Sequence, residues 1–309
     1  MARKRYGDSV HGWLVIDKAP DITSAKVVNR ARKILNAAKV GHSGTLDPMA
    51  TGVLPLAFGE ATKTVSYMME DSKEYLFTVC WGEATDTDDA EGEIIETSDH
   101  RPGRAEIEAA LPGFIGEIDQ IPPAYSAIKI DGERAYKLAR DEKPLDLKPR
   151  KIIIERFELI NCPDEAHASF EVTSGKGAYI RGLARDLARK LGTVGHISSL
   201  RRTRVGSFTE NDAISLAKLE ELGHKGAAVD ILRPVETALD DIPALALTAD
   251  EARRLRCGQS VSALTVAKRT PLTDIGQGAT ICAMADGKVV ALAKLKGGEI
   301  HPFRVLNFL

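Results

Sequence analysis

The sequence contains few cysteines and no long apolar segment. Its four cysteines, Cys80, Cys162, Cys257 and Cys282, are widely separated, and none belongs to a CxxC motif or a histidine-rich cluster. This spacing indicates reduced thiols, with neither a disulfide framework nor a zinc site. Neither a run of 18 apolar residues nor a secretory signal peptide is present. We therefore expect a soluble, cytoplasmic protein with no membrane partner.

The chain also lacks a net positive charge. It has 42 lysines and arginines against 44 aspartates and glutamates, which gives a formal net charge of −2. Any binding to nucleic acid must therefore depend on local basic patches. The sequence has no GxxxxGK(S/T) motif and no GxGxxG motif after a strand. Their absence argues against a nucleotide cofactor.

What is present is enough apolar sequence for two structural units. With 309 residues, 43% of them hydrophobic, the chain can bury a sizeable core. We expect a basic N-terminal arm (1–10), a large domain (11–240) with a Pro-, Lys- and Arg-rich insertion at about 121–150, and a small C-terminal unit (241–309). In the last, Thr248 and Glu251 form a capping-box pattern, and Asp286-Gly287 predicts a hairpin. Short strands there predict a small barrel.

Residues 41–63, GHSGTLDPMATGVLPLAFGEATK, are the most informative stretch. Its glycines permit unusual backbone angles, while Pro48 pushes Asp47 toward an extended conformation. Asp47 is therefore expected in a stiff turn, held from behind by a buried apolar strand at 53–58 that covers one edge of a sheet. An aspartate before proline in a glycine-rich turn is, however, often only a turn-forming residue.

Three further stretches combine apolar periodicity with polar groups. Residues 73–82 alternate as a strand, and Tyr75 begins its apolar row. In residues 174–191, Tyr179 and Arg181 are two apart, so an extended segment would project both from one face before a helix begins. Residues 195–208 predict a strand that carries Leu200 beside Arg201, Arg202 and Arg204, which suits contact with phosphates.

These stretches together resemble the bacterial TruB-type tRNA pseudouridine synthases. The family pattern G-H-(S/T)-G-x-L-D-P-x-A-x-G matches residues 41–52, and K-x-Y matches residues 73–75. K-G-x-Y-I-R matches residues 176–181, and H-(x)3-L-R-R-(T/L)-x-V-(G/S) matches residues 196–206. A sister family that modifies ribosomal RNA has R-L-D where this chain has Thr45 before Leu-Asp, which favours the tRNA branch.

One stretch departs from the family pattern. The family usually has D-K-P-x-G-x-T-S where residues 17–24 read DKAPDITS. The expected glycine is replaced by Asp21 or Ile22, so this turn is expected to differ in shape.

The resemblance implies an activity and a fold. The activity is isomerisation of uridine 55 to pseudouridine in the T loop of tRNA, without cofactor or metal, by a monomer whose partner is the T stem-loop. The fold is α+β: a catalytic domain with a long mixed, mainly antiparallel sheet flanked by helices, and a small barrel-like, PUA-like C-terminal RNA-binding domain. Residues 121–150 would form a thumb over the RNA, with Lys129, Arg134, Lys137 and Arg140 as phosphate contacts.

The resemblance also assigns roles to residues. The reaction must break the bond between ribose C1′ and uracil N1, and the carboxylate of Asp47 would act as the nucleophile. Attack at C1′, attack at C6 and removal of a sugar proton all stay open. Burial beside an apolar base disfavours an ionised carboxylate, so Arg181 is expected to balance its charge. Tyr75 completes the catalytic set, and the expected substrate contacts are His42, Tyr75, Tyr179, Leu200, Lys18 and Lys63, the two lysines binding phosphate or holding the loop.

Two other functions compete with this interpretation. A glycosidase also places an aspartate at an anomeric carbon, but it needs a second, protonated carboxyl group, and no second acidic motif of similar context is found. A non-catalytic RNA-binding or RNA-folding protein could use the same elements. Such a protein would work equally well after substitution of Asp47.

Overall fold

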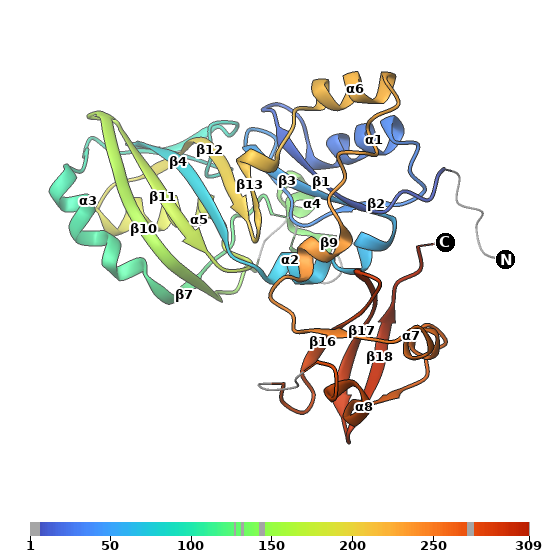
Figure 1. Ribbon diagram of the computed structural model, residues 1–309. Coiled ribbons are helices and arrows are strands. Elements are labelled where there is room, and N and C mark those ends of the chain that lie inside the picture. The colour runs from blue at the N-terminus through green and yellow to red at the C-terminus, as the bar shows by residue number, and fades with distance from the viewer. Residues whose placement is uncertain (1–6, 127, 131–132, 142–145, 271–274, 309) are drawn as a thin grey trace.

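The computed structural model describes residues 7–126, 128–130, 133–141, 146–270 and 275–308. Their main feature is a nine-stranded sheet of order β1-β3-β12-β4-β11-β10-β7, with β2 beside β3 and β13 beside β12 (Figure 1). Its pairings are antiparallel except that of β3 with β12. The strands are β1 (Gly12–Lys18), β2 (Val40–His42), β3 (Thr51–Phe58), β4 (Lys73–Trp81), β7 (Gly116–Gln120), β10 (Arg150–Asp164), β11 (His167–Ser174), β12 (Gly195–Val205) and β13 (Phe208–Thr209).

Strand β3 lies inside the sheet and is buried from its second residue onward, which confirms the expected buried strand behind the turn. It pairs with β1 along its length, with β2 near its end and with β12 near its start. Pro55 has no N–H to donate, but the carbonyl of Val15 opposite it accepts from Ile214 N at 3.0 Å instead, and the carbonyl of Pro55 accepts a hydrogen bond from Ser43 N at 3.2 Å. That bond also ties the turn carrying Asp47 to the strand behind it.

Both faces of the sheet near β1 are covered. Leu14 and Ile16 belong to the core on one side, and Trp13 and Val15 to the core on the other. Because alternate residues of a strand point to opposite faces, this double burial explains the nearly continuous apolar sequence of β1.

Helices complete the larger core. Leu183 and Leu187 of α5 (Ile180–Lys190) pack in one cluster with Phe77 and Trp81 of β4. Helices α1 (Ser24–Ile34) and α6 (Leu216–His224) contact each other at the β1 end of the sheet (Figure 1). The remaining elements are η1 (Gly59–Lys63), α2 (Val65–Glu70), β5 (Glu83–Thr85), β6 (Ile94–Thr97), α3 (Arg104–Ala110), η2 (Leu111–Phe114), η3 (Glu210–Asp212) and η4 (Val235–Leu239).

The insertion expected to form a thumb is described in part. It contains the short hairpin β8 (Lys129–Ile130) and β9 (Glu133–Arg134), followed by α4 (Ala135–Arg140). The side chains of the four expected phosphate contacts, Lys129, Arg134, Lys137 and Arg140, lie outside the described part of the chain. So do residues 1–6 of the N-terminal arm.

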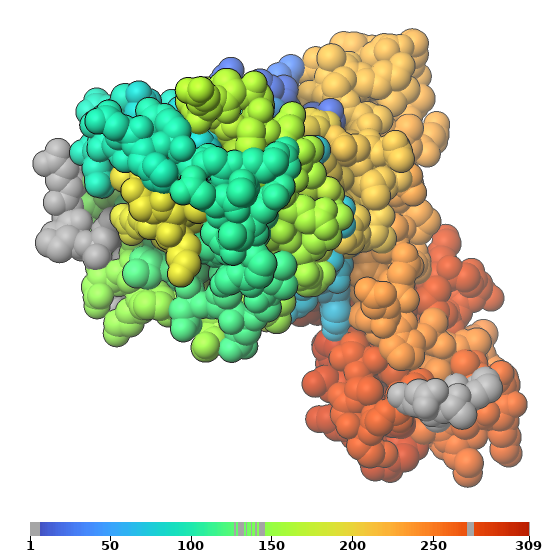
Figure 2. Space-filling model, turned by 90° about the vertical axis from the view of Figure 1, so that its left-hand side faces the viewer, coloured from blue at the N-terminus to red at the C-terminus, as the bar shows by residue number. Residues whose placement is uncertain are grey.

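A second, five-stranded sheet forms near the C-terminus, in the order β14-β16-β17-β18-β15. The capping box of Thr248 and Glu251 begins α7, and Asp286 and Gly287, both with positive φ, form the turn of the hairpin. Figure 2 shows this unit projecting from the main body. Its elements are β14 (Ala244–Ala246), α7 (Ala249–Arg256), β15 (Val261–Ser262), α8 (Ala263–Ala267), β16 (Thr280–Ala285), β17 (Lys288–Lys296) and β18 (Glu299–Val305).

An apolar cluster joins the two sheets. Val289 and Leu292 of β17 and Leu306 pack in one core with Trp13 and Phe208 of the large sheet. The predicted fold class, α+β with a large mixed sheet and a small second β unit, is confirmed. Among the described residues, no helix has the length and apolar character needed to cross a membrane.

Candidate active site

The turn between β2 and β3 carries Asp47 and is fixed from several sides. The hydroxyl of Ser24 donates to the Leu46 carbonyl and accepts from the Leu46 amide, both at 2.9 Å. Lys18 Nζ donates to the carbonyl of Pro48 at 2.8 Å. The backbone is thus held on both sides of Asp47, whose side chain is 33% exposed. The stiff turn predicted from Pro48 is therefore reinforced by side chains from β1 and α1.

Arg181 lies directly behind this carboxylate. Its Nε donates to Asp47 Oδ2 at 2.9 Å, Nη1 to the carbonyl of Thr87 at 2.6 Å and Nη2 to the carbonyl of Tyr125 at 2.8 Å. Only 4% of the Arg181 side chain is exposed. A guanidinium bound in three directions has one orientation, so it presents a fixed positive charge to Asp47.

Asp89 is the residue of this site that the sequence reasoning missed. Its carboxylate lies 3.4 Å from Arg181 Nη1, and 4% of its side chain is exposed. It accepts hydrogen bonds from the hydroxyl of Thr87 at 2.6 Å and the amide of Glu91 at 3.1 Å. Arg181 is therefore bracketed by two carboxylates, and Asp47 shares its counterion. The sequence gives no local signal for this role, because Asp89 and Arg181 are far apart along the chain.

A cleft of about 540 Å³ opens in front of Asp47. Its lining includes Tyr75, Tyr179 and Leu200, which places four of the expected site residues in one cavity. Tyr75 and Leu200 are 8% and 7% exposed, so they form an apolar wall. The guanidinium of Arg150 lies 4.8 Å from the ring centre of Tyr179. The cleft therefore offers a carboxylate beside aromatic and aliphatic surfaces that suit a flat base.

One detail of the expected geometry was wrong. Tyr179 is extended, but Arg181 lies in the first turn of α5 instead of in the same extended segment. The helix begins at Ile180, and Arg181 reaches Asp47 from its first turn. Gln120 fixes this junction by accepting from the Tyr179 amide at 2.9 Å and donating to its carbonyl at 3.0 Å.

Three expected substrate contacts do not line the cleft. Lys18 is fully buried and donates to the carbonyls of Ala19, Ile22 and Pro48, so it holds the loop, one of its two expected roles. Burial lowers the pKa of Lys18 to about 8.

His42 and Lys63 are also engaged with the protein itself. His42 Nδ1 accepts from the amide of Gly44 at 3.2 Å, and its pKa is lowered, mainly by burial. Lys63 Nζ binds Glu60 at 2.6 Å and the carbonyl of Val305 at 2.8 Å, which ties η1 to the C-terminal unit. Lys63 thus lies at the junction of the two sheets and does not hold the Asp47 loop.

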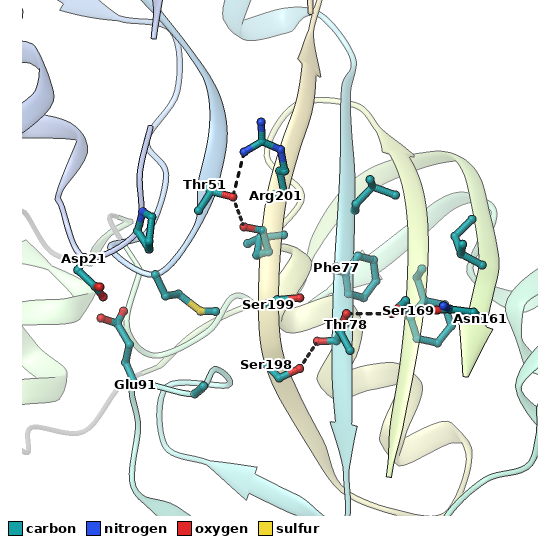
Figure 3. A pocket seen from close by; sticks show the side chains of 17 residues that line it. Asp21, Thr51, Phe77, Thr78, Glu91, Asn161, Ser169, Ser198, Ser199 and Arg201 are labelled. Carbon is teal, nitrogen blue, oxygen red and sulfur yellow. Dashed lines mark hydrogen bonds between the residues drawn. The ribbon is translucent and has the colours of Figure 1, made fainter. Parts of the chain in front are cut away.

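A larger hollow of about 800 Å³ lies on the other face of β12 and β4 (Figure 3). Thr78, Ser169 and Ser198 line it with hydroxyl groups, Asp21 and Glu91 contribute carboxylates, and Arg201 lies at its edge beside Thr51. Its lining shares Leu200 with the smaller cleft but includes none of Asp47, Tyr75 and Tyr179. The smaller cleft is therefore the candidate active site on chemical grounds.

One group of side chains could hold a cation. Cys80, Glu83 and His196 have potential ligand atoms within 4.8 Å of one another. Cys80 and His196 are opposite each other in β4 and β12, a proximity that their sequence spacing does not reveal. Tyr75 lies at the other end of β4. The group is therefore separate from the cleft.

Comparison with known proteins agrees with this geometry. A model of the N-terminal domain of the TruB family of pseudouridylate synthases matches residues 32–180, and one of the tRNA pseudouridylate synthase B C-terminal domain matches residues 181–240. A tRNA pseudouridine synthase B of Rhodospirillum rubrum is 56% identical over 99% of this chain and 100% of its own. The chain belongs to the TruB family.

Other relatives extend this match. The tRNA pseudouridine synthase B of Caulobacter vibrioides is 51% identical to the present chain over 99% of both proteins. Among solved structures, a chain in the crystal structure of a Cbf5-Nop10-Gar1 complex superposes with a TM-score of 0.75 and 26% identity, covering 97% of this chain and 86% of that one. The predicted family and enzyme class are thus confirmed: this TruB-family member is a tRNA pseudouridine synthase.

Proposed function

We propose that this enzyme isomerises uridine 55 in the T loop of tRNA, with Asp47 as the nucleophile toward a uridine flipped out of the loop. The isomerisation breaks the bond between C1′ and N1 and forms one between C1′ and C5, while N1 gains a proton and C5 loses one. The observation that carries the proposal is the 2.9 Å ion pair of Asp47 and Arg181 beside a cleft lined by two tyrosines and a leucine.

Each lining residue has a role in this proposal. Arg181 keeps Asp47 ionised when the base excludes water, because a nearby positive charge favours the carboxylate over the acid. Tyr75 packs against the uracil and assists its proton transfer, while Tyr179 and Leu200 hold the detached ring during its rotation. Flipping a nucleotide costs a few kcal/mol, which contacts of this kind offset.

The substrate contacts extend beyond the base. Arg150, Lys151 and Lys176 also line the cleft; Lys151 pairs with Glu117 at 3.3 Å and Lys176 with Glu70, and in our proposal these exposed lysines exchange their carboxylates for phosphates. In our proposal the T stem-loop lies along this rim, and the 121–150 segment closes over it as a thumb. The C-terminal unit binds RNA as a PUA-like domain. The enzyme acts as a monomer in the cytoplasm, with a catalytic domain of residues 11–240 and a C-terminal domain of residues 241–309.

The test is a comparison of the natural protein with Asp47→Asn on an unmodified tRNA transcript. We expect pseudouridine at position 55 with the natural protein and none with the variant, while RNA affinity stays within about threefold because the amide keeps the shape of the carboxylate. Pseudouridine is read by mass spectrometry after nuclease digestion. Ordinary turnover by Asp47→Asn would remove the carboxylate from the mechanism, and modification elsewhere would change the assigned site.

The same variant addresses the competing functions. A protein that only folds RNA would promote tRNA folding equally well with and without the carboxylate, and it would leave uridine 55 unchanged. A glycosidase would release free uracil, which chromatography of the reaction mixture detects.

A further inference from the structure

The three arginines near the end of β12 differ in how their charges are balanced. Arg201 and Arg204 each form ion pairs with carboxylates. The pairs are Arg201 with Asp17 at 3.0 Å and with Glu210 at 2.5 Å, and Arg204 with Glu74 at 2.8 Å. Arg202 lies between them in the sequence, and among the residues that the structure describes no carboxylate balances its charge in this way.

Arg202 is 2% exposed and binds only backbone carbonyls. Its Nε donates to Val53 O at 2.8 Å and its Nη2 to Gly44 O at 3.1 Å. Within the described ranges, Arg202 forms no ion pair, and its Nη1 has no hydrogen-bond partner. Because Arg201 and Arg202 alternate along the strand, Arg201 lines the hydroxyl-rich hollow, while Arg202 lines the cleft that contains Asp47.

A second cation lies in the same wall of the cleft. Lys73 is 8% exposed, and its Nζ donates to the carbonyls of Met69 at 3.0 Å and Asp71 at 2.5 Å. Burial and, after it, the charge of Arg202 lower its pKa to about 8, while Asp71 and Glu70 act in the opposite direction. Buried cations are normally paired with anions, whereas in the described part of the chain neither of these two neighbours forms a direct ion pair, and Asp71 and Glu70 act on Lys73 only from a longer range.

We propose that Arg202 and Lys73 form a binding site for a phosphodiester of the RNA backbone next to the flipped uridine. The inference rests on the proposed function. Arg202 is opposite Tyr75 in the β12–β4 pairing and two residues from Leu200. When a base lies against Tyr75 and Leu200, the RNA backbone attached to it therefore passes close to Arg202. The free Nη1 supplies a charge-assisted hydrogen bond to a phosphate oxygen.

This site also connects substrate binding to the catalytic turn. The guanidinium that binds the phosphate is fixed to the carbonyl of Gly44, three residues before Asp47. Gly44 has a φ of +156°, and a Cβ there would come within 3.4 Å of Arg202 Nη1. The absence of a side chain at Gly44 therefore keeps the approach to Nη1 open.

The test uses T stem-loop RNAs that each carry one uncharged methylphosphonate in place of a phosphodiester near uridine 55. Affinity is measured in an Asp47→Asn background, so that turnover does not change the RNA. We expect one or two positions to weaken binding about tenfold. In the Arg202→Gln and Lys73→Gln variants, a methylphosphonate at the same positions should weaken RNA binding by less than a further twofold. The slope of log affinity against log salt should fall by roughly one for Arg202→Gln.

Arg201→Gln is the matched control, since Arg201 is the adjacent residue, faces the other side of the sheet and is paired with carboxylates. It should keep the methylphosphonate profile and the salt slope. If Arg202→Gln weakens binding but also keeps that profile and slope, Arg202 only clamps the loop and the inference is wrong. Lys73→Gln leaves the carbonyl contacts of Arg202 intact, so it tests the site even if Arg202→Gln does not fold.

The two proposals fail in different ways. Absence of pseudouridine at position 55 with the natural protein contradicts the proposed function. Formation of pseudouridine at that position, together with methylphosphonate effects that are identical in all variants, contradicts only the phosphate site.

Discussion

Arg181 Nε donates a 2.9 Å hydrogen bond to Asp47 Oδ2 across a sequence separation of 134 residues. The arginine comes from the first turn of α5 and the aspartate from the turn before β3. Since the other two arms of the guanidinium bind the carbonyls of Thr87 and Tyr125, both its charge and its direction are fixed.

Arg181→Lys therefore tests geometry at constant charge. A lysine keeps the positive charge but cannot bind Asp47 and two carbonyls in three directions at once. We expect the single-turnover rate of pseudouridine formation to fall about 100-fold, equivalent to about 3 kcal/mol of transition-state stabilisation, while RNA affinity changes less than threefold. Equal losses of rate and affinity would instead identify Arg181 as a phosphate-binding residue.

Asp89→Asn tests the second carboxylate on Arg181. The amide keeps the shape of the side chain but removes the charge that shares the guanidinium with Asp47. We expect the single-turnover rate to fall about tenfold, or about 1.4 kcal/mol, with RNA affinity nearly unchanged.

The neighbouring Asp88 provides a control for the Asp89 substitution. Asp88 pairs at 3.1 Å with Arg185 of α5, the helix that also carries Arg181. Asp88→Asn should change the rate less than twofold. A comparable loss in both variants would mean that any charge removed from this loop disturbs the site.

Lys18→Met tests the support beneath the turn that carries Asp47. Loss of the ammonium leaves the carbonyls of Ala19, Ile22 and Pro48 without their buried donor. We expect the free energy of unfolding to fall by about 2–4 kcal/mol, because each buried acceptor left unsatisfied costs roughly 1–3 kcal/mol and the site relaxes in part. Denaturant titration measures this change, and substitution of the exposed Lys26 by methionine serves as the control.

RNA affinity should depend on the charge of Lys73. Its pKa in the free protein is lowered to about 8 by burial, then by Arg202, while Asp71 and Glu70 act in the opposite direction. The protonated form binds phosphate, so affinity is highest well below pH 8 and is lost as the pH rises through and above that value. Fluorescence anisotropy between pH 7 and pH 9.5 should show this decline. Lys73→Gln should remove the decline, and an unchanged decline would assign it to another group.

Local patterns predicted much of the chain. The alternation of residues 73–82 predicted β4, and the capping box and Asp286-Gly287 turn predicted elements of the second sheet. These predictions succeeded because side-chain periodicity, caps and turn conformations depend on residues close in sequence. Family motifs placed Asp47, Tyr75, Tyr179 and Leu200 in one site, and the structure brings all four to one cleft.

The amino-acid sequence by itself determined many of the elements, the stiff turn around Asp47 and the set of candidate site residues. Only the tertiary structure decided which charges meet. It pairs Asp89 with Arg181, buries Lys18 under the turn, and places Lys63 at the junction of the sheets. It also neutralises Arg201 and leaves Arg202 facing the cleft. Such pairings arise when strands distant in sequence become neighbours, so their energies depend on distances that no local pattern encodes.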